Sequence, residues 1–372
     1  MDSYLKIGCN FDESIPKLLN ELNKDKNGIY IDEVYGSIKE HSWLTARPSF
    51  RLPDISENEL REYIKRLKEI DIRFNYTLNT STIGSKSEIY EKQDYITEQI
   101  KMLIDIGVDT FTVTLPYVAG MIRKINNNVG ICVSTIANLE SITQINVWFE
   151  RYGINKVCSN LSKNRDIRYL ENAANFCNRN NIDLELMVNE FCGCGTANSG
   201  VAHCIYRNHC YYLHSTDYTI GDSKKLDDYP MSCCISSRDK GEVWLKLNYI
   251  RPEDIKLYND IGINHFKITG RTANYDYLKR VITAYKYKLY NGNLLDLWKH
   301  LQTITDVKEE EYKSDIYIDN RKLDGFLDFW FKNKGHLCYR EVCGESCSYC
   351  DNYYKIYILG VGPKLEISCN KE

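Results

Sequence analysis

The sequence predicts an α/β fold in which eight parallel strands, each followed by a helix, close into a TIM-like (β/α)8 barrel. Short apolar runs rich in β-branched residues alternate with longer stretches of helical period, and this alternation repeats eight times. Several expected helices also end at a glycine directly before the next run. The alternative is a doubly wound open sheet. It has less support, because no glycine-rich dinucleotide-binding turn follows the first strand and the chain has no phosphate-binding loop with lysine and serine or threonine.

The expected strands are short runs of the kind found in buried sheets. In chain order they are Tyr4–Cys9, Ile29–Val34, Phe74–Leu78, Thr110–Leu115, Ile131–Thr135, Lys156–Ser159, Leu184–Val188 and His265–Thr269. Polar residues at or near their ends are candidates for an active-site rim, since barrel enzymes build their chemistry where strands end. These candidates are Cys9, Asn10, Glu33, Tyr35, Asn79, Ser134, Thr135, Asn160, Asn189, Glu190, Thr269 and Arg271, with Pro116 and Gly270 between them.

The expected helices lie between these strands and carry recognisable start signals. They include Glu57–Ile70, Tyr95–Ile106, Leu139–Tyr152, Arg168–Arg179 and Pro252–Ile261. Ser56, with Glu59 three residues later, has the pattern of a capping box. Pro252 suits the first turn of a helix. Gly107 and Gly262 are placed to end helices immediately before strands.

The connection after the seventh strand breaks the barrel pattern. It runs from residue 190 to residue 244 without a long apolar helix and carries six cysteines: Cys192, Cys194, Cys204, Cys210, Cys233 and Cys234. Loops of this size inside a compact domain are usually functional. We therefore expect residues 1–290 to form the barrel, with this loop as an insertion. Residues 291–372 are expected to form a helix at Asn291–Thr305, a charged linker at Asp306–Ser314 and a small cysteine module.

Clustered cysteines are either oxidised to disulfides or bound to a soft metal, and the cell compartment decides between the two. The first residues of the chain do not resemble a secretory signal, so we expect a reduced, cytoplasmic protein with metal-bound thiolates. Adjacent cysteines seldom bind one metal ion together. One of Cys192 and Cys194, and one of Cys233 and Cys234, is therefore expected to join Cys204 and Cys210 as ligands. An iron–sulfur cluster is favoured, and zinc, with His203 and His209 as further candidates, is the alternative.

A second cluster contains Cys338, Cys343, Cys347 and Cys350. Four cysteines within thirteen residues predict a second metal site, either iron–sulfur or zinc, although one of them could instead complete the first site. The cysteines inside strands and on an apolar helix face, Cys132, Cys158 and Cys177, are interpreted as buried small hydrophobic residues.

Charge and hydropathy exclude some classes of protein. The formal net charge is −3, with acids and bases interspersed, so no surface for a dedicated DNA-binding protein is indicated. No apolar run is long enough to cross a membrane. The sequence also lacks a serine–histidine–aspartate order and a histidine–glutamate zinc-protease helix, so no hydrolytic machinery can be named.

The segment Val188-Asn189-Glu190-Phe191, the cysteines after it, Pro252-Glu253-Asp254 and the block from Gly262 to Arg271 together resemble the collagenase-like peptidase family U32. The resemblance covers about Tyr4 to Gly292. It implies a barrel with a cysteine-bound [4Fe–4S] cluster. Despite the family name, its best-understood members are oxygen-independent hydroxylation proteins. They act on ubiquinone precursors or on RNA bases, with prephenate implicated as the oxygen source, and a protein partner of the same family is an expectation.

The chain departs from the family pattern at three places. Val201-Ala202-His203 replaces the usual His-Gly-Ala, no cysteine corresponds to the family's Lys-Asp-Leu-Cys element near Leu247–Ile250, and the terminal cysteine module is extra. The resemblance therefore carries cluster binding most directly onto Cys204 and Cys210, with Cys192 and Cys233 completing the expected set. Glu190 and Arg271 are expected to handle protons and an anionic co-substrate, because the planar fork of arginine suits a carboxylate. The substrate is a small molecule or an RNA base. A peptidase and a non-catalytic electron-transfer protein are the alternatives.

Overall fold

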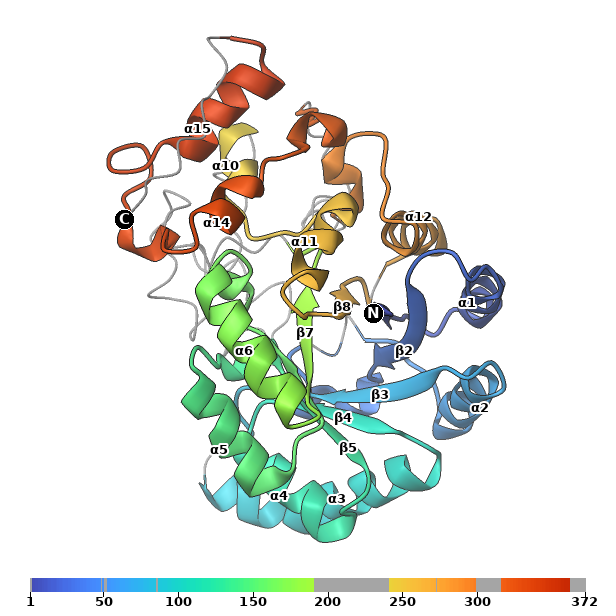
Figure 1. Cartoon of the computed structure of the whole chain (residues 1–372). Helices are drawn as coiled ribbons and strands as arrows, with labels where there is room; N and C mark the ends of the chain where they lie inside the picture. Colours follow the sequence, from blue (N-terminus) through green and yellow to red (C-terminus); the bar gives the residue numbers. More distant parts are fainter. Residues whose placement is uncertain are drawn as a thin grey trace, which may run out of the picture.

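The computed structural model describes residues 2–47, 49, 52–84, 86–190, 241–271, 273–298 and 316–361. Eight parallel strands form a closed barrel in chain order, which confirms the predicted fold class (Figure 1). They are β1 (Tyr4–Gly8), β2 (Tyr30–Gly36), β3 (Arg73–Leu78), β4 (Thr110–Val113), β5 (Gly130–Val133), β6 (Lys156–Cys158), β7 (Asp183–Met187) and β8 (His265–Ile268). The barrel closes where β1 pairs with β8, with Leu5 opposite Phe266 and Ile7 opposite Ile268.

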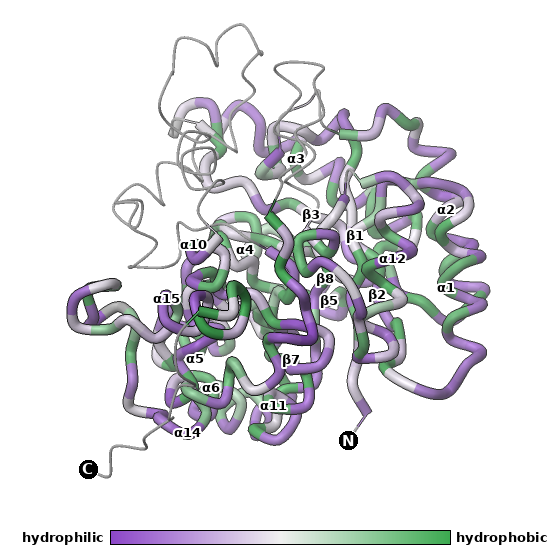
Figure 2. The backbone as a smooth tube through the Cα atoms, turned by 90° about the horizontal axis from the view of Figure 1, so that it is seen from above, coloured by the Kyte–Doolittle hydropathy of each residue, from purple (hydrophilic) through white to green (hydrophobic). Residues whose placement is uncertain are grey.

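Helices surround this barrel. They are α1 (Ser14–Lys24), α2 (Glu57–Lys68), α3 (Lys86–Asp105), α4 (Pro116–Ile125), α5 (Ile142–Tyr152), α6 (Ile167–Arg179), α10 (Gly241–Leu245), α11 (Ile255–Asn259) and α12 (Tyr275–Lys286). Seen from above, α1, α2 and α12 lie together outside β1 and β2 (Figure 2). The main hydrophobic core fills the space between strands and helices, because alternate strand residues such as Leu5, Phe74 and Phe111 join buried helix residues there.

Local signals account for several helix boundaries. Ser56 and Glu59 form the expected capping box, in which Glu59 N donates to Ser56 Oγ at 3.3 Å and Ser56 N donates to Glu59 Oε2 at 2.7 Å. Gly107 and Gly262 have φ values of +102° and +86°, the left-handed conformation that ends a helix. Pro252 begins a single 3₁₀ turn, Pro252–Asp254, and the five-residue α11 follows, so the expected helix over Pro252–Ile261 is split in two.

The C-terminal residues 316–361 pack against one end of the barrel, where α14 (Asp328–Lys332) and α15 (Tyr349–Tyr353) lie beside α10 (Figure 1). In the described part of the expected helix Asn291–Thr305, the only helical piece is the 3₁₀ turn Leu294–Leu297. The rest of that helix, and the expected linker Asp306–Ser314, lie outside the described residues. The boundary between barrel and module at residue 290 stays a prediction.

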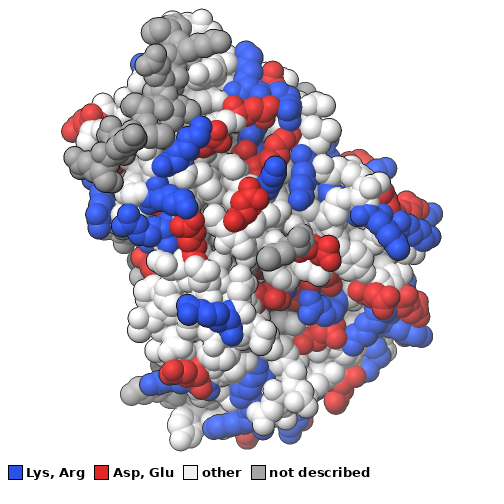
Figure 3. Space-filling view, viewed as in Figure 1, with Lys and Arg blue, Asp and Glu red and all other residues white. Residues whose placement is uncertain are grey.

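The described part of the chain has no helix of sufficient length and apolar character to cross a membrane. On the face shown in Figure 3, Lys and Arg side chains alternate with Asp and Glu, and broad areas carry neither.

Candidate active site at the barrel mouth

Arg271 lies directly after β8, at the end of the barrel where all strands finish. Its side chain is only 9% exposed, and Nη1 donates to Ser37 Oγ at 3.2 Å and to Thr45 Oγ1 at 3.4 Å. Gly8 makes room for it, since a Cβ there would lie 3.0 Å from Arg271 N. No carboxylate in the described part of the chain pairs with this guanidinium. Burial, and secondly the nearby charge of Arg47, lower the pKa of Arg271 to about 10.

Tyr35 separates this mouth from the barrel interior. Its hydroxyl donates to Ile268 O at 3.2 Å, which ties β2 to β8 across the closure of the barrel. Three cations surround its ring: Lys267 Nζ lies 4.2 Å from the ring centroid, Lys6 Nζ 5.7 Å and the Arg271 guanidinium carbon 5.8 Å. Positive charge is therefore concentrated around the Tyr35 ring, from Arg271 at the mouth to Lys267 and Lys6 in the interior.

The barrel interior below Tyr35 holds buried charges instead of the branched aliphatic layers common in such barrels. Glu33 Oε2 accepts a hydrogen bond from Lys156 Nζ at 2.8 Å and lies 3.5 Å from Lys6 Nζ. Glu185 lies 3.4 Å from Lys6 Nζ and 3.9 Å from Lys267 Nζ. We call these five residues, Lys6, Glu33, Lys156, Glu185 and Lys267, the interior charge network. It contains three lysines and two glutamates, so it carries a formal excess of positive charge.

Neighbouring groups favour the ionised form of Glu33. The Lys156 and Lys6 cations hold the pKa of Glu33 well below its usual range, against the opposing effect of burial. Asn75 Nδ2 donates to Glu33 Oε1 at 2.9 Å, and Thr112 Oγ1 donates to Asn75 Oδ1 at 2.6 Å. The carboxylate thus has partners from four other strands of the barrel, β1, β3, β4 and β6, counting the indirect one through Asn75.

Several predicted rim residues do meet at the mouth. Asn79 lies after β3; its Oδ1 accepts from Thr45 Oγ1 at 3.3 Å and its Nδ2 donates to Ser134 Oγ at 3.4 Å. Thr45 also contacts Arg271, so a polar chain runs from the arginine along the rim to the end of β5. Glu33 is different: it lies inside the barrel and not at the rim, because β2 extends to Gly36 and places Glu33 mid-strand.

Asn189 fixes the point where the cysteine-rich segment begins. Its Oδ1 accepts from Thr269 N at 2.7 Å, and its Nδ2 donates to Tyr277 Oη at 3.2 Å. The amide therefore joins the ends of β7 and β8. Glu190, the next residue, is half-buried and is the last one described before the gap at 191–240.

Most of the predicted metal ligands cannot be placed. Cys192, Cys194, Cys204, Cys210, Cys233 and Cys234 lie outside the described residues. Cys338, Cys343, Cys347 and Cys350 are among the described residues, and none of them forms a disulfide there. Cys132, Cys158 and Cys177 are buried, as predicted. Sequence reasoning missed Lys6, Lys156, Glu185 and Lys267. Their signal was a charged residue within an otherwise apolar strand or, for Lys156, at its first position.

The profile of peptidase family U32 matches residues 26–322, about four-fifths of the chain, and this span includes Arg271, Asn189, Tyr35 and most of the interior charge network. The chain belongs to peptidase family U32. This confirms the resemblance seen in the sequence. Among curated proteins, the U32 chain is 28% identical to an uncharacterized protease of Methanocaldococcus jannaschii over 349 residues, which are 91% of this chain and 93% of that protein.

Solved structures resemble this U32 protein more distantly. A solved U32 peptidase superposes with a TM-score of 0.41 at 16% identity and covers 59% of this chain and 80% of that one. An HpcH/HpaI aldolase from Desulfitobacterium hafniense gives a TM-score of 0.31 at 10% identity, over 56% of this chain and 83% of that one. Residues 338–350, with the second cysteine cluster, lie beyond the span that the family profile matches.

Proposed function

We propose that this U32 protein is an oxygen-independent, iron–sulfur-dependent hydroxylase that binds an anionic co-substrate, such as prephenate, at the barrel mouth. The observation that carries the proposal is Arg271, a buried guanidinium with no carboxylate partner among the described residues. Burying such a cation carries a large desolvation free energy unless a negatively charged group binds beside it. A carboxylate bound at Nη2 and Nε, opposite the contacts that Ser37 and Thr45 make with Nη1, would remove that cost.

The position of the cysteine-rich segment supports the cofactor. The segment leaves the barrel at Glu190 and the chain returns beside β7, where Ile250 N donates to Val188 O at 2.9 Å. Both flanks are thus fixed at the barrel end that also holds Arg271. Thiolate donors suit iron–sulfur chemistry, and Cys192, Cys204, Cys210 and Cys233 are the proposed ligands, with Cys194 and Cys234 as substitutes. When bound, such a [4Fe–4S] cluster supplies single electrons.

The residues of the chain itself have distinct proposed roles. Arg271 binds and orients the carboxylate. Glu190 follows Asn189, whose side chain is fixed by hydrogen bonds, and transfers a proton at the same mouth. The positive charge around the Tyr35 ring, from Lys267 and Lys6, strengthens the attraction for an anion entering the barrel. The hydroxylated substrate is a small molecule or an RNA base.

Two measurements on the full chain test this proposal. Anaerobic purification followed by iron and sulfide analysis should give about four irons per chain for one cubane cluster. Calorimetric titration with prephenate should show binding that Arg271→Gln weakens at least tenfold, as expected for loss of a charge-assisted pair worth more than about 1.4 kcal/mol.

Arg61→Gln is the matched control, because Arg61 is half-exposed on α2 and pairs only with Glu57 in the described structure. It should bind prephenate like the parent. A preparation with neither iron nor sulfide, or equal prephenate affinity in the parent and Arg271→Gln, contradicts the proposal. Peptide cleavage retained after loss of iron would favour the peptidase alternative.

A further inference from the structure

The C-terminal segment that holds the second cysteine cluster packs against a barrel residue, Arg165. This arginine has no role in the proposed reaction. Arg165 follows β6, and its side chain is 4% exposed. Nη1 donates to Leu245 O at 2.9 Å, whereas Nε and Nη2 are buried without a hydrogen-bond partner in the described structure. The described residues also supply no carboxylate to this guanidinium. Arg165 is therefore a second buried cation that lacks a countercharge.

Aromatic rings hold Arg165 against the C-terminal segment. The guanidinium carbon lies 4.5 Å from the Trp330 ring centroid, 5.2 Å from that of Phe326 and 5.5 Å from that of Tyr249. Cation–π contacts recover part of the desolvation cost, but they leave the two free N–H donors unused. An anionic group with sulfur or oxygen acceptors is what these donors need.

Cysteines are the nearest candidates for that anion. Cys338 and Cys350 pack against the hydrophobic cluster that contains Phe326 and Trp330, the rings that also contact Arg165. Trp330 Nε1 donates to Cys338 Sγ at 3.1 Å, a second N–H group directed at the same cluster.

The backbone presents the four cysteines with metal-ligand spacing. Successive cysteines are separated by four, three and two residues, and each gap falls in the range found between paired zinc ligands. Cys343 and Cys347 face each other across a tight turn, in which Gly344 N donates to Cys347 O at 2.8 Å and Gly344 takes a φ of +89°.

We propose that Cys338, Cys343, Cys347 and Cys350 bind one soft metal centre as thiolates, with Arg165 as its countercharge on the barrel. A divalent ion that replaces four S–H protons releases those protons and leaves a site of net charge −2. Arg165 would balance part of that charge, and Lys246, directly after α10, is held near Cys350 by its ion pair with the neighbouring Asp351 at 2.7 Å. This site goes beyond the proposed function, because it uses none of the cysteines after β7.

In the described structure, no three His, Cys, Asp or Glu side chains are gathered closely enough to hold a metal ion. Metal binding would therefore require the cysteine side chains to rotate toward one another. Such closure makes metal binding a source of folding free energy for this segment. Zinc and an iron–sulfur cluster share the required four-thiolate chemistry, and elemental analysis distinguishes them.

The test compares metal content in full-length variants purified without oxygen. Cys343→Ser combined with Cys347→Ser changes two half-exposed positions, so the core should be undisturbed, which circular dichroism can check. We expect this double variant to lose one zinc per chain, or the iron and sulfide of one cluster, relative to the parent. Cys369→Ser removes a thiol outside the four and should retain the parental content. A double variant with parental metal content overturns the inference.

A second comparison isolates Arg165. Arg165→Leu should release metal to a chromogenic chelator at least tenfold faster than the parent, whereas Arg165→Lys, which keeps the charge, should fall between them. Equal release rates would contradict the countercharge role. A chain with zinc on this module and no iron would support this inference while contradicting the proposed hydroxylase. Loss of all metal in Cys204→Ala combined with Cys210→Ala would contradict the separate site.

Discussion

At the scale of single residues, Arg271 is a position whose burial is unfavourable for the fold. Arg271 keeps a positive charge in a buried position with two hydroxyl partners and no described carboxylate. Natural proteins seldom accept such a charge for structural reasons, since an uncharged side chain of similar size would fill the space at lower cost. The arginine is thus better explained by a ligand than by the fold.

This reasoning predicts that Arg271→Met stabilises the ligand-free protein. We expect its free energy of unfolding at pH 7 to rise by about 1–2 kcal/mol, measured by urea denaturation. The folded-state pKa of Arg271 is lowered to about 10, so folding disfavours the protonated form. The parent should regain stability as the pH rises through 10, and the difference between the two proteins should then shrink. A clear loss of stability in Arg271→Met at pH 7 would assign a structural role to the arginine.

At the scale of elements, the strands of this barrel are joined by side chains as well as by backbone pairing. The Glu33 carboxylate on β2 lies between Lys6 on β1 and Lys156 on β6. Removing one partner of a buried ionic group leaves the other charges uncompensated, at a cost of about 3–5 kcal/mol.

Glu33→Gln should therefore destabilise the protein by about 3–5 kcal/mol at pH 7 in urea denaturation. The pKa of Glu33 is depressed in the folded state, so its contribution is present above its unfolded pKa and declines as the pH falls below about 4.3. The gap between parent and variant should narrow on acidification. Asp54→Asn is the control: its pair with Lys39 at 2.6 Å is largely exposed, and the change should stay under about 1 kcal/mol. Similar losses in both variants would mean that burial of the network does not matter.

At this same scale, the course of the strands follows from local sequence, whereas the pairing of buried charges does not. Strand bounds were predictable to within one or two residues because short apolar runs mark the strands, and the Ser56 cap marks the start of α2. The partnership of Glu33 with Lys156 was not, since 123 residues separate them and nothing local marks either as a partner. The expected helix after Asn291 is a single 3₁₀ turn in its described part, where Leu294, Leu295 and Leu297 are all buried by tertiary packing. Arg271 and Asn189 could be assigned to the mouth because each follows the end of a predicted strand, and strand ends can be located in the sequence.

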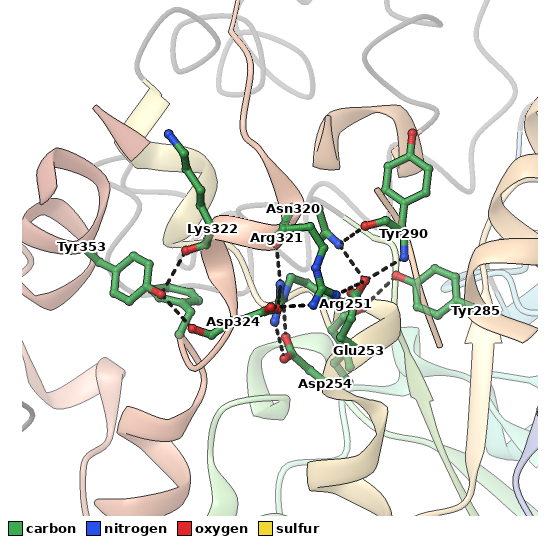
Figure 4. A network of polar contacts seen from close by, with 12 residues as sticks. Arg251, Glu253, Asp254, Tyr285, Tyr290, Asn320, Arg321, Lys322, Asp324 and Tyr353 are labelled. Atoms are coloured by element: carbon green, nitrogen blue, oxygen red, sulfur yellow. Dashed lines mark hydrogen bonds and ion pairs between the residues drawn. The ribbon is translucent and has the colours of Figure 1, made fainter. Parts of the chain in front are cut away.

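For the whole molecule, a buried arginine joins the C-terminal segment to the barrel. Arg251 holds Asp254 with two hydrogen bonds of 2.7 and 2.8 Å, while its Nη1 donates to Asn320 O at 2.6 Å (Figure 4). Asn320 Nδ2 in turn donates to Glu253 Oε1 at 2.9 Å, and Tyr353 Oη donates to Lys322 O at 3.2 Å. Residues 316–361 are therefore docked on the barrel by polar contacts of Arg251 and Glu253 with Asn320, of which the Arg251 contact is buried and the Glu253 contact is partly buried.

Arg251→Met should weaken the attachment of residues 316–361 to the barrel. We expect a loss of about 3–5 kcal/mol in stability, because Asp254 is left buried without its cation, and faster cleavage of the C-terminal segment in limited proteolysis. Arg321→Met is the matched control. Arg321 belongs to the same network, with Glu253 at 3.3 Å and Asp324 at 2.7 Å, but it is exposed, so its loss should cost under about 1 kcal/mol. Equal proteolysis of both variants would show that the segment is held by other contacts.

The interior charge network also has a consequence for protein synthesis. Lys6 and Glu33 leave the ribosome with the first two strands, but Lys156 and Glu185 belong to β6 and β7. At about 5–20 residues per second, the 123 residues from Val34 to Lys156 take roughly 6–25 s to translate. Throughout that interval Lys6 and Glu33 have each other as partners, but Glu33 lacks Lys156 and Lys6 lacks Glu185, so burying the two strands leaves the network incomplete. The N-terminal half of the nascent chain should therefore stay exposed to chaperones and proteases until β7 emerges, and the barrel should close late, as one unit.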